Sequence, residues 1–228
     1  MPTSAISLIQ WLNKGEYRET QAVLASFADE ANTDEVRIYH ADVLTNIQAH
    51  DALRTWFGGG NSQYCFIGAH GVPGPTGAAI GIGASSDATE FVEWQDLWNW
   101  FAEGNLEGGL WLGACKSSDA AAALSPFLKS VYTAIPHIYG FSEPIYPAEI
   151  QQILSKLIEF TRLDDFLWLD EELAQLRAAV PDTKIELFYP ASTKSGPREY
   201  MNVDDMPKKI NKTFRELLEQ IEESRRGQ

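Results

Sequence analysis

The fold is decided by two short apolar stretches, Tyr64-Cys-Phe-Ile-Gly-Ala-His70-Gly71 and Gly109-Leu-Trp-Leu-Gly-Ala-Cys115. Short apolar runs bounded by glycine-rich turns are typical of buried strands. We therefore expect His70 and Cys115 at the ends of two strands, where α/β sheets place their functional sites. The interval between them leaves room for a hairpin or a crossover with a helix, so the two strands can lie side by side in a parallel sheet.

A thiol beside an imidazole combines a nucleophile with its general base. Cys115 is followed by Lys116 and by a predicted helix, and both favour a thiolate. His70 precedes Gly71, whose missing Cβ allows backbone or substrate to approach closely. A lone cysteine on a buried strand is usually a small core residue, so the pairing with His70 is what predicts a Cys/His dyad.

This pattern resembles that of the caspase-like cysteine peptidases, and most closely that of their bacterial CHAT branch. The segments that carry the resemblance are Gly68-Ala-His70-Gly71 and Leu112-Gly-Ala-Cys115-Lys-Ser117. In outline the resemblance extends over residues 36–190. The chain departs from the CHAT pattern at Gly113, where serine is frequent, and at Lys116, where an acidic residue is common.

The resemblance implies an α/β fold of the caspase-like type, a three-layer sandwich whose mostly parallel central sheet of about six strands carries helices on both faces. It implies a cysteine endopeptidase in which Cys115 attacks the scissile carbonyl and His70 shuttles the proton. The backbone N–H groups of Gly71 and Cys115 would form the oxyanion hole. This chemistry requires no cofactor. Two other functions stay open, a caspase-like protein-binding module with little catalysis and a thiol esterase or acyltransferase.

The resemblance also indicates where substrate binds. In caspase-like folds, the pocket for the residue before the cut is lined from the end of the first strand, from the position two before the cysteine and from the loop after the next strand. In this chain these positions are Asp42, Gly113, Ser142 and Glu143. Two acids and a glycine would form a roomy anionic pocket suited to Lys or Arg. The alternative is that Asp42 caps a turn and Glu143 is solvated.

The remaining cysteine and histidines lack such a setting. Cys65 lies within its strand and, by alternation, points to the opposite face from His70, so we expect it in the core. The other histidines are scattered and form no metal cluster with the two cysteines: His40, His50 and His137.

Composition limits the class of protein and its partners. The chain has 228 residues, 44% of them hydrophobic, which suits a globular protein with a sizeable core. The formal net charge of −14 and the lack of a basic patch exclude nucleic acid as a direct ligand. An acidic field concentrates cationic peptides, although solubility alone is a sufficient reason for the charge. No apolar run approaches the ~20 residues of a membrane span, and no leader pattern is present, so we expect no membrane contact, a cytoplasmic location and free thiols.

Two parts are predicted along the chain. Residues 1–33, with apolar residues at helical spacing, are predicted to form a helical hairpin packed on a peptidase domain of residues 34–228. Strands are predicted at 36–42, 64–70, 79–83, 110–114, 138–142 and 184–189, and helices at 45–57, 90–103, 120–130, 147–161, 169–180 and 210–226. Residues 71–77 are rich in Gly and Pro and are expected to form an irregular hinge loop. We expect a protein or peptide substrate and a separate regulatory partner or complex.

Overall fold

The structure is a computed structural model that describes residues 5–12, 37–42, 45, 47–49, 51–52, 64–87, 89–103, 109–130, 137–161, 169–192 and 198–205. Within this part of the chain, no helix is long and apolar enough to cross a membrane.

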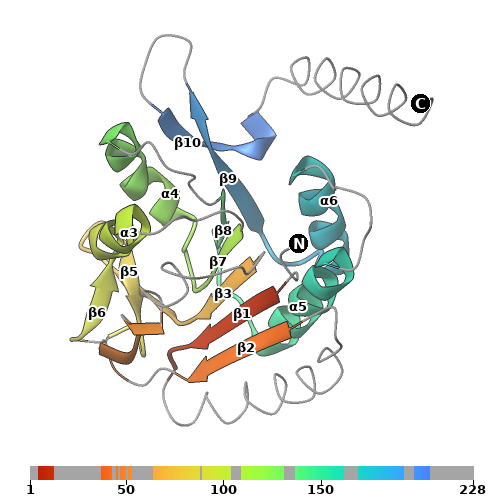
Figure 1. The fold of residues 1–228 in the computed structure, drawn as a ribbon, viewed down its shortest axis with the longest axis horizontal. Coiled ribbons are helices and arrows are strands. Elements are labelled where there is room, and N and C mark those ends of the chain that lie inside the picture. Colours follow the sequence, from red (N-terminus) through yellow and green to blue (C-terminus); the bar gives the residue numbers. More distant parts are fainter. Residues whose placement is uncertain are drawn as a thin grey trace.

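A seven-stranded mixed sheet forms the centre of the molecule (Figure 1). Its strands are β1 (Ala5–Gln10), β2 (Arg37–Asp42), β3 (Tyr64–Gly68), β7 (Gly109–Gly113), β8 (His137–Phe141), β9 (Ile185–Ser192) and β10 (Arg198–Asn202). They are ordered β10-β9-β8-β7-β3-β1-β2. Along this order, β2, β1, β3, β7 and β8 pair in parallel with one another, whereas β9 is antiparallel to both of its neighbours, β8 and β10.

A second sheet of three antiparallel strands lies beside the first (Figure 1). It consists of β4 (His70–Pro73), β5 (Ala79–Gly83) and β6 (Phe91–Glu93). The helices are α3 (Trp94–Glu103), α4 (Asp119–Leu124), α5 (Pro147–Thr161) and α6 (Leu169–Ala179), with 3-10 turns at Ser125–Ser130 and Val203–Asp205.

Two hydrophobic cores show that helices cover both faces of the large sheet. One core joins Leu97 of α3 and Leu124 of α4 to Cys65 of β3. The other joins α5 and α6 to the alternate residues of the same strands, including Phe66 of β3. This alternation is what a sheet buried on both sides requires. The predicted α/β class with helices on both faces is therefore confirmed, in a sheet of seven strands that is not parallel throughout.

Two local predictions are wrong, and one strand has no counterpart among the predicted elements. Ala5–Gln10 is strand β1, between β2 and β3, and not part of a helix; the rest of the predicted hairpin up to residue 33 lies outside the described residues. Strand β10 was not predicted, because the run Arg198–Asn202 carries few apolar residues. Gly71–Pro73 belongs to a hairpin and not to an irregular loop. The predicted helix at 210–226 also lies outside the described residues.

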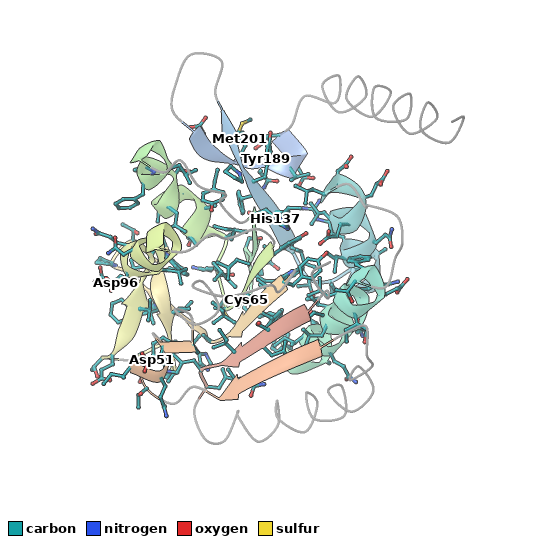
Figure 2. The ribbon with its side chains drawn as sticks, viewed as in Figure 1. Asp51, Cys65, Asp96, His137, Tyr189 and Met201 are labelled. Atoms are coloured by element: carbon teal, nitrogen blue, oxygen red, sulfur yellow. The ribbon has the colours of Figure 1, made fainter. Side chains whose placement is uncertain are left out.

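A buried polar cluster lies between the sheet and α6. The Tyr139 hydroxyl donates a hydrogen bond to Glu172, and Trp111 stacks on Tyr139 with ring centroids 4.0 Å apart. Burial raises the pKa of Glu172 to about 7, against an opposing effect of hydrogen bonds from Tyr139 and Tyr64. Burial also disfavours the charged form of His137, which is labelled in Figure 2, and lowers the pKa of this histidine to about 4. Both side chains are therefore held largely neutral in the folded protein near pH 6.

Glu172 is expected to make the protein less stable as the pH rises. Between its usual pKa of 4.5 and its folded pKa of about 7, the folded state binds more protons at Glu172 than the unfolded state does. The unfolding free energy of Glu172→Gln, relative to that of the wild type, should therefore increase by about 3 kcal/mol from pH 4.5 to 7. Urea unfolding at a series of pH values measures this difference, and a difference that stays constant with pH contradicts the assignment.

Candidate active site

The two decisive apolar stretches are adjacent parallel strands. Tyr64 pairs with Gly109 and Gly68 pairs with Gly113, so β3 and β7 end at the same edge of the sheet. Just beyond them, the Ala69 N–H donates a hydrogen bond of 3.2 Å to the Gly113 carbonyl. His70 does not end β3, as the sequence analysis expected, but begins β4 in the second sheet.

The backbone of Gly71 lies directly against that of Cys115. A Cβ atom built on Gly71 would lie 2.0 Å from the Cys115 carbonyl oxygen and 3.6 Å from its backbone nitrogen. Only a glycine permits this approach. It brings the His70-Gly71 segment and Cys115 together, and both His70 and Cys115 remain partly exposed. The two segments that carry the predicted pair thus meet through their backbones, and each of the two residues is partly accessible to solvent.

The two cysteines lie in contrasting environments. Both are free thiols, but Cys65 is fully buried in the core (Figure 2), and burial raises the pKa of its thiol. A thiol held protonated in this way is a poor nucleophile. Cys115, by contrast, is partly exposed at the carboxyl edge of the sheet.

Hydrogen bonds from Ser117 fix the loop after Cys115. The Ser117 hydroxyl donates to the Leu112 carbonyl at 2.6 Å and accepts from the Phe141 N–H at 3.0 Å, so it joins the ends of β7 and β8. Gly140 of β8 allows the backbone of Ser118 to lie close to this strand, because a Cβ on Gly140 would be only 2.6 Å from the Ser118 nitrogen. Ser118 directly precedes α4, and its side chain makes no hydrogen bond that caps the helix.

Asp87 lies close enough to His70 for their charges to interact, and no motif in the sequence marks it. The antiparallel hairpin pairs His70 with Gly83, and Asp87 follows in the loop after β5. A hydrogen bond of 2.7 Å from the Ser85 hydroxyl is the main cause that lowers the pKa of Asp87, and the charge of His70 contributes. The proximity depends on the hairpin, so no local sequence pattern predicts it.

The strand order separates the residues predicted to bind substrate. Asp42 ends β2 at the edge of the sheet, and β1 and β3 lie between it and Gly113. With strands about 4.8 Å apart, the backbones of Asp42 and Gly113 are ~14 Å apart. Glu143 forms an ion pair with Lys184, and both side chains are largely exposed. The four predicted residues therefore do not form one anionic pocket.

Ser142 and Gly113 also have other surroundings than expected. Ser142 contributes to a hollow of about 310 Å³. The hollow is lined by Ser142, Arg177, Pro181, Thr183, Lys184, Ile185, Glu186 and Asp204. At Gly113, the space that a Cβ would take is filled by the Phe66 ring at 2.6 Å, so this glycine serves close packing and opens no room.

Gln10 takes the place in the sheet that the sequence analysis assigned to Asp42. It ends β1 and is in register with Asp42 on one side and Gly68 on the other. Its side chain is 2% exposed, and neither Oε1 nor Nε2 has a hydrogen-bond partner among the described residues. A buried amide without partners is costly unless another group binds it. In the sequence, Gln10 is a polar residue at the end of a short apolar run, which is a feature of a strand that ends at a site. The prediction of a helix over this run hides that feature.

The other histidines do not join the site. His40 lies in β2 and His137 at the start of β8, while His50 is outside the described residues. In the described part of the chain, no three His, Cys, Asp or Glu residues are grouped so that they could hold a metal ion.

The arrangement at the sheet edge can support nucleophilic chemistry. It combines an accessible thiol, a histidine on the adjoining segment and a carboxylate near that histidine.

Comparison of the sequence with models of protein families and with curated proteins gives no match.

Proposed function

We propose that the protein is a cysteine endopeptidase of the caspase-like type, with Cys115 and His70 as its catalytic residues. The observation that carries the proposal is the backbone contact between Gly71 and Cys115, which joins the two segments at the carboxyl edge of adjacent strands. Neither the contact nor the partial exposure of both residues is needed to stabilise a core. Nucleophile and base within reach of each other and of solvent are the minimum that acyl transfer requires.

In the proposed reaction, the Cys115 sulfur attacks the scissile carbonyl while His70 takes the thiol proton. The resulting oxyanion is bound by the backbone N–H groups of Gly71 and Cys115. His70 then donates the proton to the leaving amine, and a thioester to Cys115 forms. Water, deprotonated by His70, hydrolyses the thioester and releases the thiol.

The substrate in this proposal is a protein or peptide chain, cleaved after a basic residue in a cytoplasmic setting and under the control of a partner protein. The formal net charge of −14 favours a cationic substrate. Asp42 is in register with Gln10 on the neighbouring strand, and its carboxylate would attract the cation of a long basic side chain.

A degenerate peptide library, with the cuts mapped by mass spectrometry, tests this function. We expect cleavage after Lys or Arg by the wild type and none by Cys115→Ala. A profile dominated by Asp or by apolar residues contradicts the basic preference. Turnover of small thioesters without peptide cleavage indicates an esterase or acyltransferase instead. If a peptidyl electrophile fails to label Cys115 in a burst, the chain is a binding module.

A further inference from the structure

The hairpin formed by β4 and β5 carries His70, and it is held by the side chains of Lys116, which directly follows Cys115, and of Asp119, the first residue of α4. Lys116 Nζ donates a hydrogen bond of 2.9 Å to the Gly77 carbonyl. Two residues further along the hairpin, the Ala79 N–H donates to Asp119 Oδ2 at 2.8 Å. These contacts join segments that are about 40 residues apart in the chain. We name this pair of hydrogen bonds the clasp.

Lys116 adopts a backbone conformation that lysine normally avoids. Its φ is 56°, and it is the one non-glycine residue with a positive φ among the described residues. The left-handed region is unfavourable for a residue with a long side chain, so surrounding contacts must hold it there. Such conformations concentrate at functional sites, and this one directly follows the proposed nucleophile. The hydrogen bond to Gly77 is one contact that holds it.

The part of the hairpin that the clasp holds is itself well defined. The Gly77 N–H donates to the Gly74 carbonyl at 3.0 Å and closes the turn. At the same residue, Trp94 Nε1 donates to the Ala79 carbonyl at 2.7 Å, and Trp94 is buried. Since β4 pairs with β5 up to His70, the turn and His70 belong to one hydrogen-bonded unit. A displacement of the turn would therefore be transmitted to His70.

We infer that Lys116 and Asp119 are positioning residues that hold the hairpin so that His70 stays beside Cys115. This inference rests on the proposed function, because it assigns the clasp a role in the Cys115/His70 dyad. The hairpin is attached to the segment from Cys115 to Asp119 in two places, at the backbone contact of Gly71 and at the clasp on Gly77 and Ala79. Without the clasp, this end of the hairpin is held only by core packing and by the hydrogen bond from Trp94, so the turn can shift, and the imidazole then spends less time within reach of the thiol.

The opposite charges of the two clasp residues permit a test that separates position from electrostatics. The rate at which iodoacetamide alkylates Cys115, located by mass spectrometry, is measured against pH for the wild type, Lys116→Met, Asp119→Ala and His70→Ala. A charge effect alone predicts opposite shifts, because removal of a cation disfavours the thiolate and removal of an anion favours it. Loss of position predicts that both variants shift in one direction, toward the profile of His70→Ala.

We expect the second result, with the half-maximal pH of alkylation raised in both variants. Peptidase activity should fall about tenfold or more, through kcat and not KM, because a misplaced base slows the chemical step. Lys116→Arg keeps a hydrogen-bond donor and Asp119→Asn keeps an acceptor. Each of these variants should therefore show the wild-type pH profile of alkylation and the wild-type peptidase activity. Lys116→Gly removes the side chain together with the backbone strain, so it should fold and still show the raised profile.

Three outcomes overturn the inference. Opposite shifts in Lys116→Met and Asp119→Ala, or a wild-type profile in folded Lys116→Gly, contradict a positioning role while the dyad stands. A profile that His70→Ala leaves unchanged contradicts the dyad, and the clasp with it. Because alkylation needs no substrate, these results can be obtained and told apart even if no peptide is cleaved.

Discussion

Replacement of Cys115 or His70 by alanine is expected to abolish peptide cleavage and to leave the fold intact. Loss of a covalent nucleophile or of its base typically lowers turnover by a factor of about 10⁴ to 10⁶. Both residues are partly exposed at the edge of the sheet, so neither substitution leaves a large cavity in a core. Turnover of the best peptide from the library, together with the urea midpoint of each variant, measures the two effects.

Cys65→Ala is the matched control for this prediction. Cys65 is fully buried in the core that α3 and α4 share with the sheet, so its truncation should lower the unfolding free energy by about 1 kcal/mol and spare activity. Cleavage retained by Cys115→Ala, or lost in folded Cys65→Ala, would show that the wrong cysteine has been assigned as the nucleophile.

Gly71→Ala should have the next largest effect, although it adds only one methyl group. Its Cβ would lie 2.0 Å from the Cys115 carbonyl oxygen, which is backbone and cannot rotate away as a side chain could. The hairpin must therefore move away from Cys115. A misplacement of about 1 Å at a catalytic group can lower the rate about 10²-fold, so we expect at least this loss in kcat/KM.

Gly68→Ala provides the steric control for Gly71→Ala. A Cβ on Gly68 would meet its nearest atoms at 3.9 and 4.0 Å, which is ordinary van der Waals contact. Its urea midpoint should therefore stay near that of the wild type, whereas Gly71→Ala should be less stable because of the clash. Equal midpoints and undiminished cleavage in Gly71→Ala would mean that the contact between the two segments is not needed for the reaction.

Much of the fold could be predicted from local patterns. The apolar runs that end at Gly68 and Gly113 are adjacent parallel strands, and α5 spans 147–161 as predicted. Cys65 lies in the core, as predicted, because every residue of β3 is buried. A strand that is buried on both faces needs a short continuous run of apolar residues, and an amphipathic helix needs apolar residues three or four positions apart. These properties belong to neighbouring residues of the chain.

The tertiary structure decided what lies next to what. The six residues of β1 are too few to show whether an apolar run is helix or strand, and only pairing with β2 and β3 makes them a strand. That pairing puts Gln10, and not Asp42, beside Gly68. Likewise the hairpin brings Asp87 near His70, and the turn at Gly77 near Lys116. Each of these contacts depends on residues distant in the chain, whose pairing is selected by the free energy of the whole fold and not by local periodicity.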